Sequence, residues 1–163
     1  MEKLKPKYVI LARHGTYDDT TGELDENGRI KAIMMAQRLE RDYLKGLKIE
    51  LFYSPKTRAE QTAEAYSQVL NIPKSELIKE YLIRETEENS IRINEATQVI
   101  EKALYSRKAE AYIFITHEDT AIDSAILFRR KNFNLETEIE TLGFAWAILL
   151  DLENPKKLIK LSP

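Results

Sequence analysis

The sequence predicts an α/β domain whose helices cover both faces of a mainly parallel sheet. Short apolar runs, rich in β-branched and aromatic residues, alternate with longer segments whose apolar residues recur at helical spacing. This alternation is typical of a layered α/β domain, and the right-handed crossover between parallel strands places helices on both faces. In addition, the two histidines of the chain, His14 and His117, each lie just past the end of an apolar run.

The first half of the chain contains two strands, each followed by a helix. Residues 8–12 are an apolar run that is too short for a stable helix, so we expect a buried strand there. Residues 28–44 carry apolar side chains at helical spacing, and residues 49–53 are the second short apolar run. We expect Ser54 to cap the next helix and Pro55 to begin it, because the missing proline N–H costs nothing at a first helical position. This helix runs to about residue 70.

The second half continues the pattern with less regular connections. We expect a short extended segment at residues 77–83, a polar loop at residues 85–94 and a helix at residues 95–107. The third clear strand follows at residues 112–116 and a further helix at residues 119–128. The pattern of residues 133–142 is ambiguous. We expect a buried strand at residues 144–150 and an edge strand at residues 157–161.

Length and composition bound the class of protein. The 163 residues, 43% of them hydrophobic, predict one domain spanning residues 1–163. Lys and Arg number 25 and Asp and Glu number 27, so the net charge of -2 does not favour nucleic-acid binding. The absence of cysteine excludes disulfides and thiol chemistry. No apolar run approaches the roughly 20 residues that span a bilayer, and no signal-type segment is visible, so we expect a cytoplasmic protein without a membrane partner.

The segment Arg13-His14-Gly15 follows the first expected strand. A neutral imidazole is nucleophilic near neutral pH, and the planar fork of an adjacent arginine binds phosphate in a bidentate way. Gly15 allows the backbone to approach closely and to turn away. Taken alone, the three residues are explained equally well as an ordinary surface loop.

Arg58 and His117 each have two interpretations. Arg58 lies in the first turn of an expected helix, where free N–H groups favour an anion, or it is a solvated arginine paired with Glu60 or Glu64. His117 either satisfies a core hydrogen bond or donates to a phosphoryl group. Metal binding explains it less well, because no ligand motif accompanies the histidines. Ligands bind outside the carboxyl ends of parallel strands, so the combination of these residues predicts an anion site at that edge.

These residues resemble those of the histidine phosphatase superfamily, also called the phosphoglycerate-mutase-like proteins. Besides Arg-His-Gly and the later Thr-His pair, the chain has residues 24–29 (LDENGR), similar to the family's Leu-Thr-x-x-Gly, and residues 54–63 (SPKTRAEQTA), which fit Ser-Pro-x-x-Arg-Ala-x-Gln-Thr-Ala. The pieces occur in family order from about residue 8 to residue 128. The resemblance implies a three-layer α/β/α sandwich, closest in size and motif to the small phosphohistidine phosphatases.

The resemblance also implies roles for the site residues. His14 would be the nucleophile that is transiently phosphorylated. Arg13, Arg58 and His117 would form the phosphate pocket around it. Many members carry an asparagine after the signature that helps to hold phosphate. This chain has none there, and Thr16 could donate in its place.

The general acid stays open among three carboxylates. Glu85 follows a Leu-Ile-Arg segment at the place of the family's glutamate, but the family's Gly-x-Trp-x-Gly-type segment is replaced by residues 86–90 (TEENS). Glu118 and Asp119 follow the second histidine, where acid-phosphatase-like members carry the acid. We rank Glu85 first, Asp119 second and Glu118 third. Each would otherwise be an ordinary solvated surface carboxylate.

The expected activity is hydrolysis of a phosphomonoester or a phosphohistidine through a phosphohistidine enzyme intermediate. No metal or other cofactor is expected, because the arginines supply positive charge, and the partner would be a phosphorylated small molecule or a phosphoprotein. The acidic pair Asp18 and Asp19 would repel a second phosphate, which favours a phosphatase over a phosphoglycerate-mutase-type phosphotransferase. The remaining alternative is a non-catalytic phosphate- or phosphoprotein-binding module, although a pure binder would not need both histidines.

Overall fold

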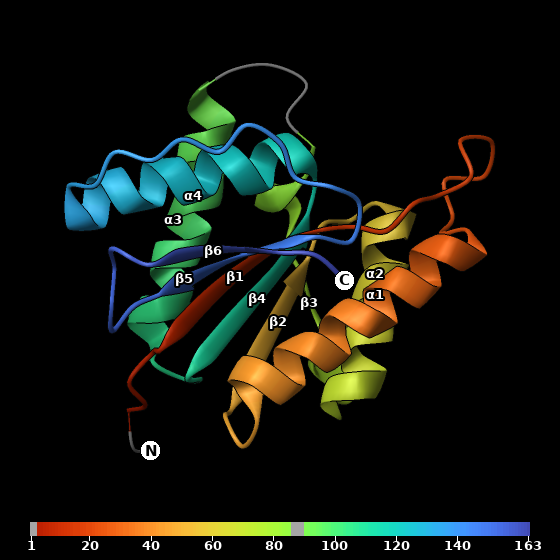
Figure 1. The fold of residues 1–163 in the computed structure, drawn as a ribbon, viewed down its shortest axis with the longest axis horizontal. Helices are drawn as coiled ribbons and strands as arrows, with labels where there is room; N and C mark the ends of the chain where they lie inside the picture. Colours follow the sequence, from red (N-terminus) through yellow and green to blue (C-terminus); the bar gives the residue numbers. More distant parts are fainter. Residues whose placement is uncertain (1–2, 86–89) are drawn as a thin grey trace.

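A central sheet organises the protein. The computed structural model describes residues 3–85 and 90–163, and in these ranges the sheet has six strands in the order β3-β2-β4-β1-β5-β6 (Figure 1). The strands are β1 (Tyr8–Arg13), β2 (Ile49–Tyr53), β3 (Ile78–Lys79), β4 (Ala111–Thr116), β5 (Ala147–Asp151) and β6 (Leu158–Leu161). The pairs β3–β2, β2–β4 and β4–β1 are parallel, whereas β5 and β6 join in antiparallel orientation. The predicted α/β class with a mainly parallel sheet is therefore confirmed.

Helices cover both faces of this sheet. Helices α1 (Glu26–Leu39) and α2 (Thr57–Leu70) cover one face (Figure 1). Helices α3 (Ser90–Ser106) and α4 (Glu118–Phe133) cover the opposite face. Within β1, Ile10 and Ala12 pack with α1 and α2, whereas Val9 and Leu11 pack with α3 and α4. Because both faces are buried, the central strands are continuous apolar runs rather than alternating ones. This is the three-layer sandwich that the resemblance implies.

The first helical region starts earlier than expected. α1 begins at Glu26 because Asp25 caps it, with the Asp25 carboxylate accepting from the backbone N–H of Gly28 at 2.6 Å. A π-helical turn, Glu40–Leu44, follows α1, so the helical region ends where the sequence predicts.

The start of the second helix differs from the prediction. α2 begins at Thr57 with Lys56 as its N-cap, so the prediction that Ser54 caps this helix and Pro55 begins it is wrong. The Ser54 hydroxyl instead contacts His117, which lies on the neighbouring strand end. Ser54 therefore contacts a residue that is distant in sequence, instead of capping the helix as its local sequence pattern predicts.

The second half departs from the prediction mainly at element ends. β3 covers only two residues of the expected segment and is followed by a 3-10 turn, Tyr81–Ile83. α3 begins at Ser90, inside the expected polar loop, and residues 86–89 of that loop lie outside the described residues. α4 extends to Phe133, residues 134–146 are irregular, and β5 therefore starts later than expected. The edge strand β6 is confirmed. In the described part of the chain, no helix combines the length and the apolar character needed to cross a bilayer.

Candidate active site

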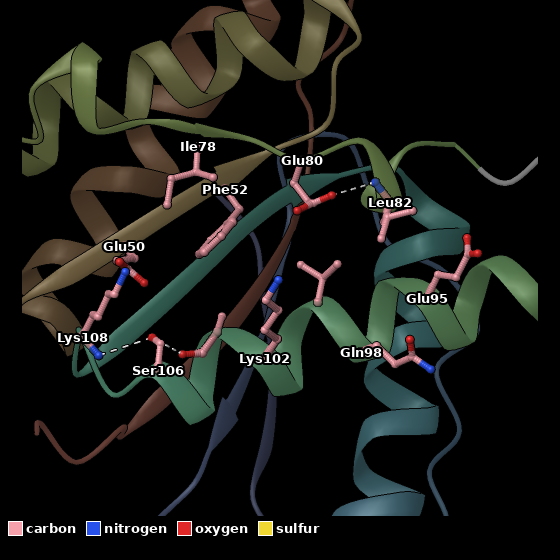
Figure 2. A pocket seen from close by; sticks show the side chains of 12 residues that line it. Glu50, Phe52, Ile78, Glu80, Leu82, Glu95, Gln98, Lys102, Ser106 and Lys108 are labelled. Carbon is pink, nitrogen blue, oxygen red and sulfur yellow. Dashed lines mark hydrogen bonds between the residues drawn. The ribbon is translucent and has the colours of Figure 1, made fainter.

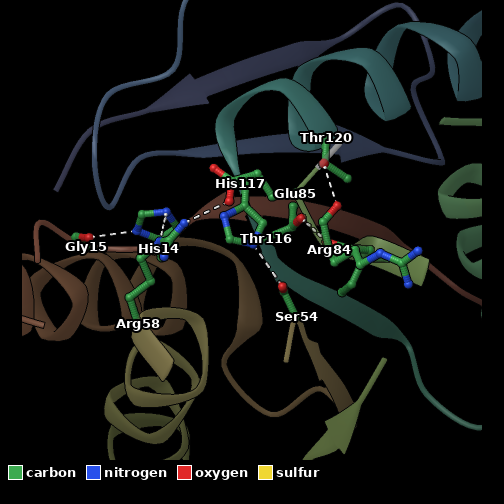
Figure 3. Close-up of polar contacts among 10 residues, drawn as sticks. His14, Gly15, Ser54, Arg58, Arg84, Glu85, Thr116, His117 and Thr120 are labelled. Atoms are coloured by element: carbon green, nitrogen blue, oxygen red, sulfur yellow. Dashed lines mark hydrogen bonds and ion pairs between the residues drawn. The ribbon is translucent and has the colours of Figure 1, made fainter. Parts of the chain in front are cut away.

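The parallel pairing of β1 with β4 brings the two histidines together. Arg13 is in register with Thr116, so His14 and His117 leave neighbouring strands side by side. Their ring centroids are 5.1 Å apart, and Arg58 reaches them from the first turn of α2 (Figure 3). The expected gathering of both imidazoles at the carboxyl edge of the sheet is therefore observed. A pocket of about 140 Å³ lies there, lined by Arg13, His14, Tyr17, Arg58, Glu85, His117, Glu118, Asp119 and Phe144.

His14 is held as a neutral ring with a defined tautomer. Only 4% of the residue is exposed. Its Nδ1 lies 2.8 Å from the carbonyl oxygen of Gly15, which can only accept, and its Nε2 lies 3.0 Å from Nε of Arg58, which can only donate. Nδ1 therefore carries the proton and Nε2 a lone pair. Burial is the main cause that lowers the pKa of His14 from 6.5 to about 3, and His117 and the two arginines of the pocket lower it further.

Each of the two arginines lies between a carboxylate and an aromatic ring. Arg58 Nη2 lies 3.1 Å from Glu85 Oε2, and its guanidinium carbon lies 4.4 Å from the centre of the Tyr17 ring. Arg13 Nη1 lies 2.9 Å from Glu118 Oε2, and its guanidinium carbon lies 3.7 Å from the centre of the Phe144 ring. Arg13 also donates to the carbonyl oxygen of residue 142 at 2.7 Å. Cation–π contacts of this kind hold a guanidinium group in place.

His117 is the second buried imidazole. It is 4% exposed, and its Nε2 lies 2.8 Å from Oγ of Ser54. Burial is the main cause that lowers its pKa from 6.5 to about 3, and the positive charges of Arg58, Lys56 and Arg13 act in the same direction. Its Nδ1 is buried without a hydrogen-bond partner among the described residues. Both imidazoles are therefore neutral at physiological pH, and one N–H or lone pair of His117 is available to a ligand.

Two glycines and helix α2 fix the loop that carries His14. The backbone N–H of Gly15 donates to Oγ1 of Thr62 at 3.2 Å, and the Thr62 hydroxyl donates to the carbonyl oxygen of Arg58 at 2.7 Å. A Cβ added to Gly28 would lie 2.0 Å from the carbonyl oxygen of Thr16, and one added to Gly15 would lie 2.6 Å from that of Gly28. Only glycine allows this close approach, so both positions contribute directly to the placement of His14.

The three candidate acids all line the pocket but differ in what holds them. The segment before Glu85 is anchored by two hydroxyls, as Thr116 donates to the carbonyl oxygen of residue 83 and Thr120 donates to that of residue 84 at 3.1 Å (Figure 3). Glu118 uses both carboxylate oxygens, one on Arg13 and one on the backbone N–H of residue 142 at 2.9 Å. Asp119 is exposed at the pocket.

Comparison with known proteins gives similar structures at low sequence identity. No protein-family model matches the chain, and no curated protein matches it in sequence. The protein histidine phosphatase SixA in complex with tungstate matches with a TM-score of 0.67 and 18% identity, covering 96% of this chain and 97% of that one. A putative phosphohistidine phosphatase SixA from Agrobacterium tumefaciens matches with a TM-score of 0.67 and 17% identity, covering 97% and 99%. The ecdysone phosphate phosphatase from Bombix mori in complex with tungstate matches with a TM-score of 0.73 and 13% identity, covering 96% and 92%.

The chain has the histidine phosphatase fold. The resemblance that the sequence motifs indicate is thus confirmed at the level of the whole fold. Within this fold, the structure brings together His14, His117, both arginines and the three carboxylates, while Thr16 lies apart. The Thr16 hydroxyl donates to the Asp25 carboxylate at 2.7 Å and is not among the groups that line the pocket. Thr16 therefore supports the start of α1 in this structure.

Three residues of the candidate site are not identified from the sequence. Tyr17 and Phe144 form aromatic walls, with their ring centroids 5.4 Å and 5.7 Å from that of His14. Ser54 contacts His117 from the end of β2. The position of Tyr17, three residues after the nucleophile candidate, was a usable signal. No local signal marks Phe144, because the antiparallel pairing of β5 with β1 brings the irregular residues before β5 to the site.

A larger groove of this histidine phosphatase fold lies away from the histidines. It has a volume of about 430 Å³ and lies between the β2–β3 edge of the sheet and α3 (Figure 2). Phe52 and Val99 contribute apolar surface to it, and Glu50 and Lys102 contribute charge. It is lined by no histidine or arginine of the described residues, so the smaller pocket is the candidate for phosphoryl chemistry. In the described ranges, no group of three or more His, Asp or Glu side chains is arranged to hold a metal ion.

Proposed function

We propose that the protein is a metal-independent phosphatase that hydrolyses a phosphomonoester or a phosphohistidine through a phosphohistidine intermediate on His14. The observation that carries this proposal is the state of the His14 ring. The Gly15 carbonyl holds Nδ1–H, which leaves the lone pair of Nε2 beside the Arg58 guanidinium group at 3.0 Å. A neutral imidazole next to fixed cations can attack an anionic phosphorus centre without first losing a proton.

The first step transfers the phosphoryl group to the enzyme. The substrate phosphate takes over the Arg58 contact, and Nε2 of His14 attacks phosphorus in line with the leaving group. A P–N bond to the enzyme forms as the bond to the leaving oxygen or nitrogen breaks, and the leaving group departs with that electron pair and a proton from a carboxylic acid. The two arginines and His117 donate to the equatorial oxygens, and preorganised donors of this kind usually supply the largest share of catalysis.

Glu85 is the carboxylate that we propose as the general acid. In the substrate-free site its side chain is 47% exposed and pairs with Arg58. When a phosphate takes over the Arg58 contact, the Glu85 carboxyl group is released from this ion pair and can face the leaving group. Glu118 is less suited to proton transfer because its two oxygens hold Arg13 and the backbone of residue 142. Asp119, exposed at the pocket, stays the second choice.

The second step returns the enzyme to its starting state. A water molecule attacks the phosphohistidine, and the Glu85 carboxylate accepts a proton from that water. The P–N bond breaks, its electron pair returns to Nε2, and inorganic phosphate leaves.

The shape of the pocket supports a phosphoryl group carried on a larger molecule. A volume of about 140 Å³ holds the phosphoryl group and little of the leaving group. Of the similar structures, one is named a putative phosphohistidine phosphatase SixA and another the protein histidine phosphatase SixA. Because the P–N bond of phosphohistidine is weak, such a substrate places a small demand on the general acid. We therefore propose a protein-borne phosphohistidine ahead of a small phosphomonoester.

The test compares the parent protein with a His14→Ala variant. Both are incubated without added metal with p-nitrophenyl phosphate and with a phosphohistidine peptide, from acidic to neutral pH. We expect release of nitrophenol and phosphate by the parent only. Brief incubation of the parent should also leave an acid-labile, alkali-stable phosphoryl group on His14. If both proteins turn over neither substrate but still bind phosphate, the protein is a binding module. Sustained isomerisation of phosphoglycerate would establish a mutase instead.

A further inference from the structure

Ser54 makes a buried contact that the mechanism above does not use. It follows the last residue of β2, is 0% exposed, and its Oγ lies 2.8 Å from Nε2 of His117 (Figure 3). The backbone N–H of Ser54 donates to the carbonyl oxygen of Ile115 at 2.9 Å, so the chain is fixed at this point. Its hydroxyl therefore sits beside the His117 ring with little freedom to move.

Two proton arrangements are possible between these side chains, and they differ in what they leave unpaired. If His117 Nε2 carries the proton and donates to Ser54, then the Ser54 hydroxyl proton lacks an acceptor among the described residues. Nδ1 would also present a lone pair to an incoming phosphate. If the Ser54 hydroxyl donates to Nε2, then Nδ1 carries the proton, and Nδ1–H is the one polar group of this pair left without a partner. The first arrangement leaves both a donor and an acceptor unpaired and the second leaves a single donor, so the second arrangement is favoured.

Nδ1 of His117 is the ring nitrogen that is buried without a partner among the described residues. His117 lines the same pocket as Arg13 and Arg58, and its ring packs against that of His14. A phosphoryl oxygen in this pocket is an acceptor that an Nδ1–H group could use.

We propose that Ser54 is a positioning residue that holds His117 in its Nδ1–H tautomer, so that this N–H donates to the transferring phosphoryl group. The donation from His117 to the phosphoryl group rests on the proposed function. The tautomer of His117 rests only on its contact with Ser54. A hydroxyl is suited to this task because it can donate to Nε2. A carboxylate in its place could only accept, and it would select the opposite tautomer.

The tautomer can be read directly, without turnover. The chain has only two histidines, so a long-range proton–nitrogen correlation spectrum of the imidazole rings contains just two spin systems. At neutral pH we expect both rings of the parent to show protonated Nδ1 and unprotonated Nε2. In a Ser54→Ala variant, His14 should keep this pattern while His117 shifts toward a mixture of tautomers. Protonated Nε2 in His117 of the parent, or an unchanged His117 in the variant, would overturn the proposal.

The role in phosphate binding is tested with tungstate and with kinetics. Loss of one oriented hydrogen bond corresponds to about a tenfold effect, so Ser54→Ala should weaken tungstate binding and lower kcat/KM by about tenfold each. Ser54→Thr, which keeps a hydroxyl, should recover most of both losses. In a His117→Ala background, Ser54→Ala should have no further effect. An equal loss in that background would assign Ser54 a merely structural role. A parent that binds tungstate and shows the expected tautomer, yet hydrolyses nothing, would refute the proposed function and leave the tautomer assignment standing.

Discussion

Acidification below about pH 6.5 is expected to destabilise the protein through its two buried histidines. Burial is the main cause that lowers the pKa of His14 and of His117 from 6.5 to about 3 in the folded protein. When the folded pKa is lower than the unfolded one, the unfolded chain binds more protons between the two values. The free energy of unfolding is therefore highest above pH 6.5 and falls as the pH falls toward 3.

The magnitude follows from the same two pKa values. Between pH 7 and pH 5 each imidazole of the unfolded chain becomes mostly protonated, while each folded ring stays neutral. The free energy of unfolding then falls by about 2 kcal/mol per ring and about 4 kcal/mol for the pair. A domain of this kind has a total stability of roughly 5–15 kcal/mol, so the loss is a large fraction of it. Carboxylates titrate mainly below about pH 5, so this window isolates the histidines.

Urea unfolding at pH 7, 6 and 5 measures the effect. The parent is compared with His14→Gln, His117→Gln and the double variant, because glutamine does not titrate and all other ionisable groups are shared. Each single variant should lose about half of the pH dependence of the parent, and the double variant nearly all of it. A double variant with the same pH dependence as the parent would refute the reasoning, since the acid sensitivity would then arise elsewhere.

Three further predictions concern the pocket and the loop that supports it. Arg58→Ala should lower kcat/KM by about 10²- to 10³-fold in steady-state assays. Arg58→Lys should recover only part of this loss, because a lysine lacks the planar fork; full recovery would show that only the positive charge of Arg58 matters. Glu85→Gln should lower kcat/KM, which reports the first step, by about 10²-fold or more for an alkyl phosphate but much less for p-nitrophenyl phosphate, since nitrophenol leaves without protonation; equal losses in kcat/KM would exclude Glu85 as the acid. Gly28→Ala should lower the free energy of unfolding by about 1–3 kcal/mol in urea titrations, because its Cβ would lie 2.0 Å from the Thr16 carbonyl oxygen; unchanged stability would contradict that close approach.

The residues that the sequence identifies best are those at strand ends. His14 and His117 could be placed together because parallel strands end at one edge, and the register of β1 with β4 bears this out. Arg58 could be placed there because the helix after β2 must start at the same edge. In these cases local pattern and the topology of the sheet point to the same position.

The residues that escape sequence reasoning depend on contacts between distant segments. The local sequence around Ser54 predicts a helix cap, but the Ser54 hydroxyl contacts His117, which lies 63 residues further along the chain. Phe144 precedes an antiparallel strand, and the order of strands in the sheet determines that this strand lies beside β1. The hydroxyl of Thr16, which could donate to phosphate in place of an asparagine, donates to the Asp25 cap of α1 in this structure. Local pattern cannot rank such competing partners.

The two imidazoles also show how one residue type can take two roles in one pocket. Both are buried, neutral and close to the same arginines. The partner of His14 is a carbonyl, which can only accept, so it fixes the proton on Nδ1 and leaves Nε2 as the nucleophile. The partner of His117 is a hydroxyl, which can donate to Nε2, and in the arrangement that we propose it leaves Nδ1–H as a donor to phosphate. The same tautomer thus presents a lone pair on His14 and an N–H on His117 to the phosphoryl group. The difference arises because the protein binds Nδ1 of His14 but Nε2 of His117.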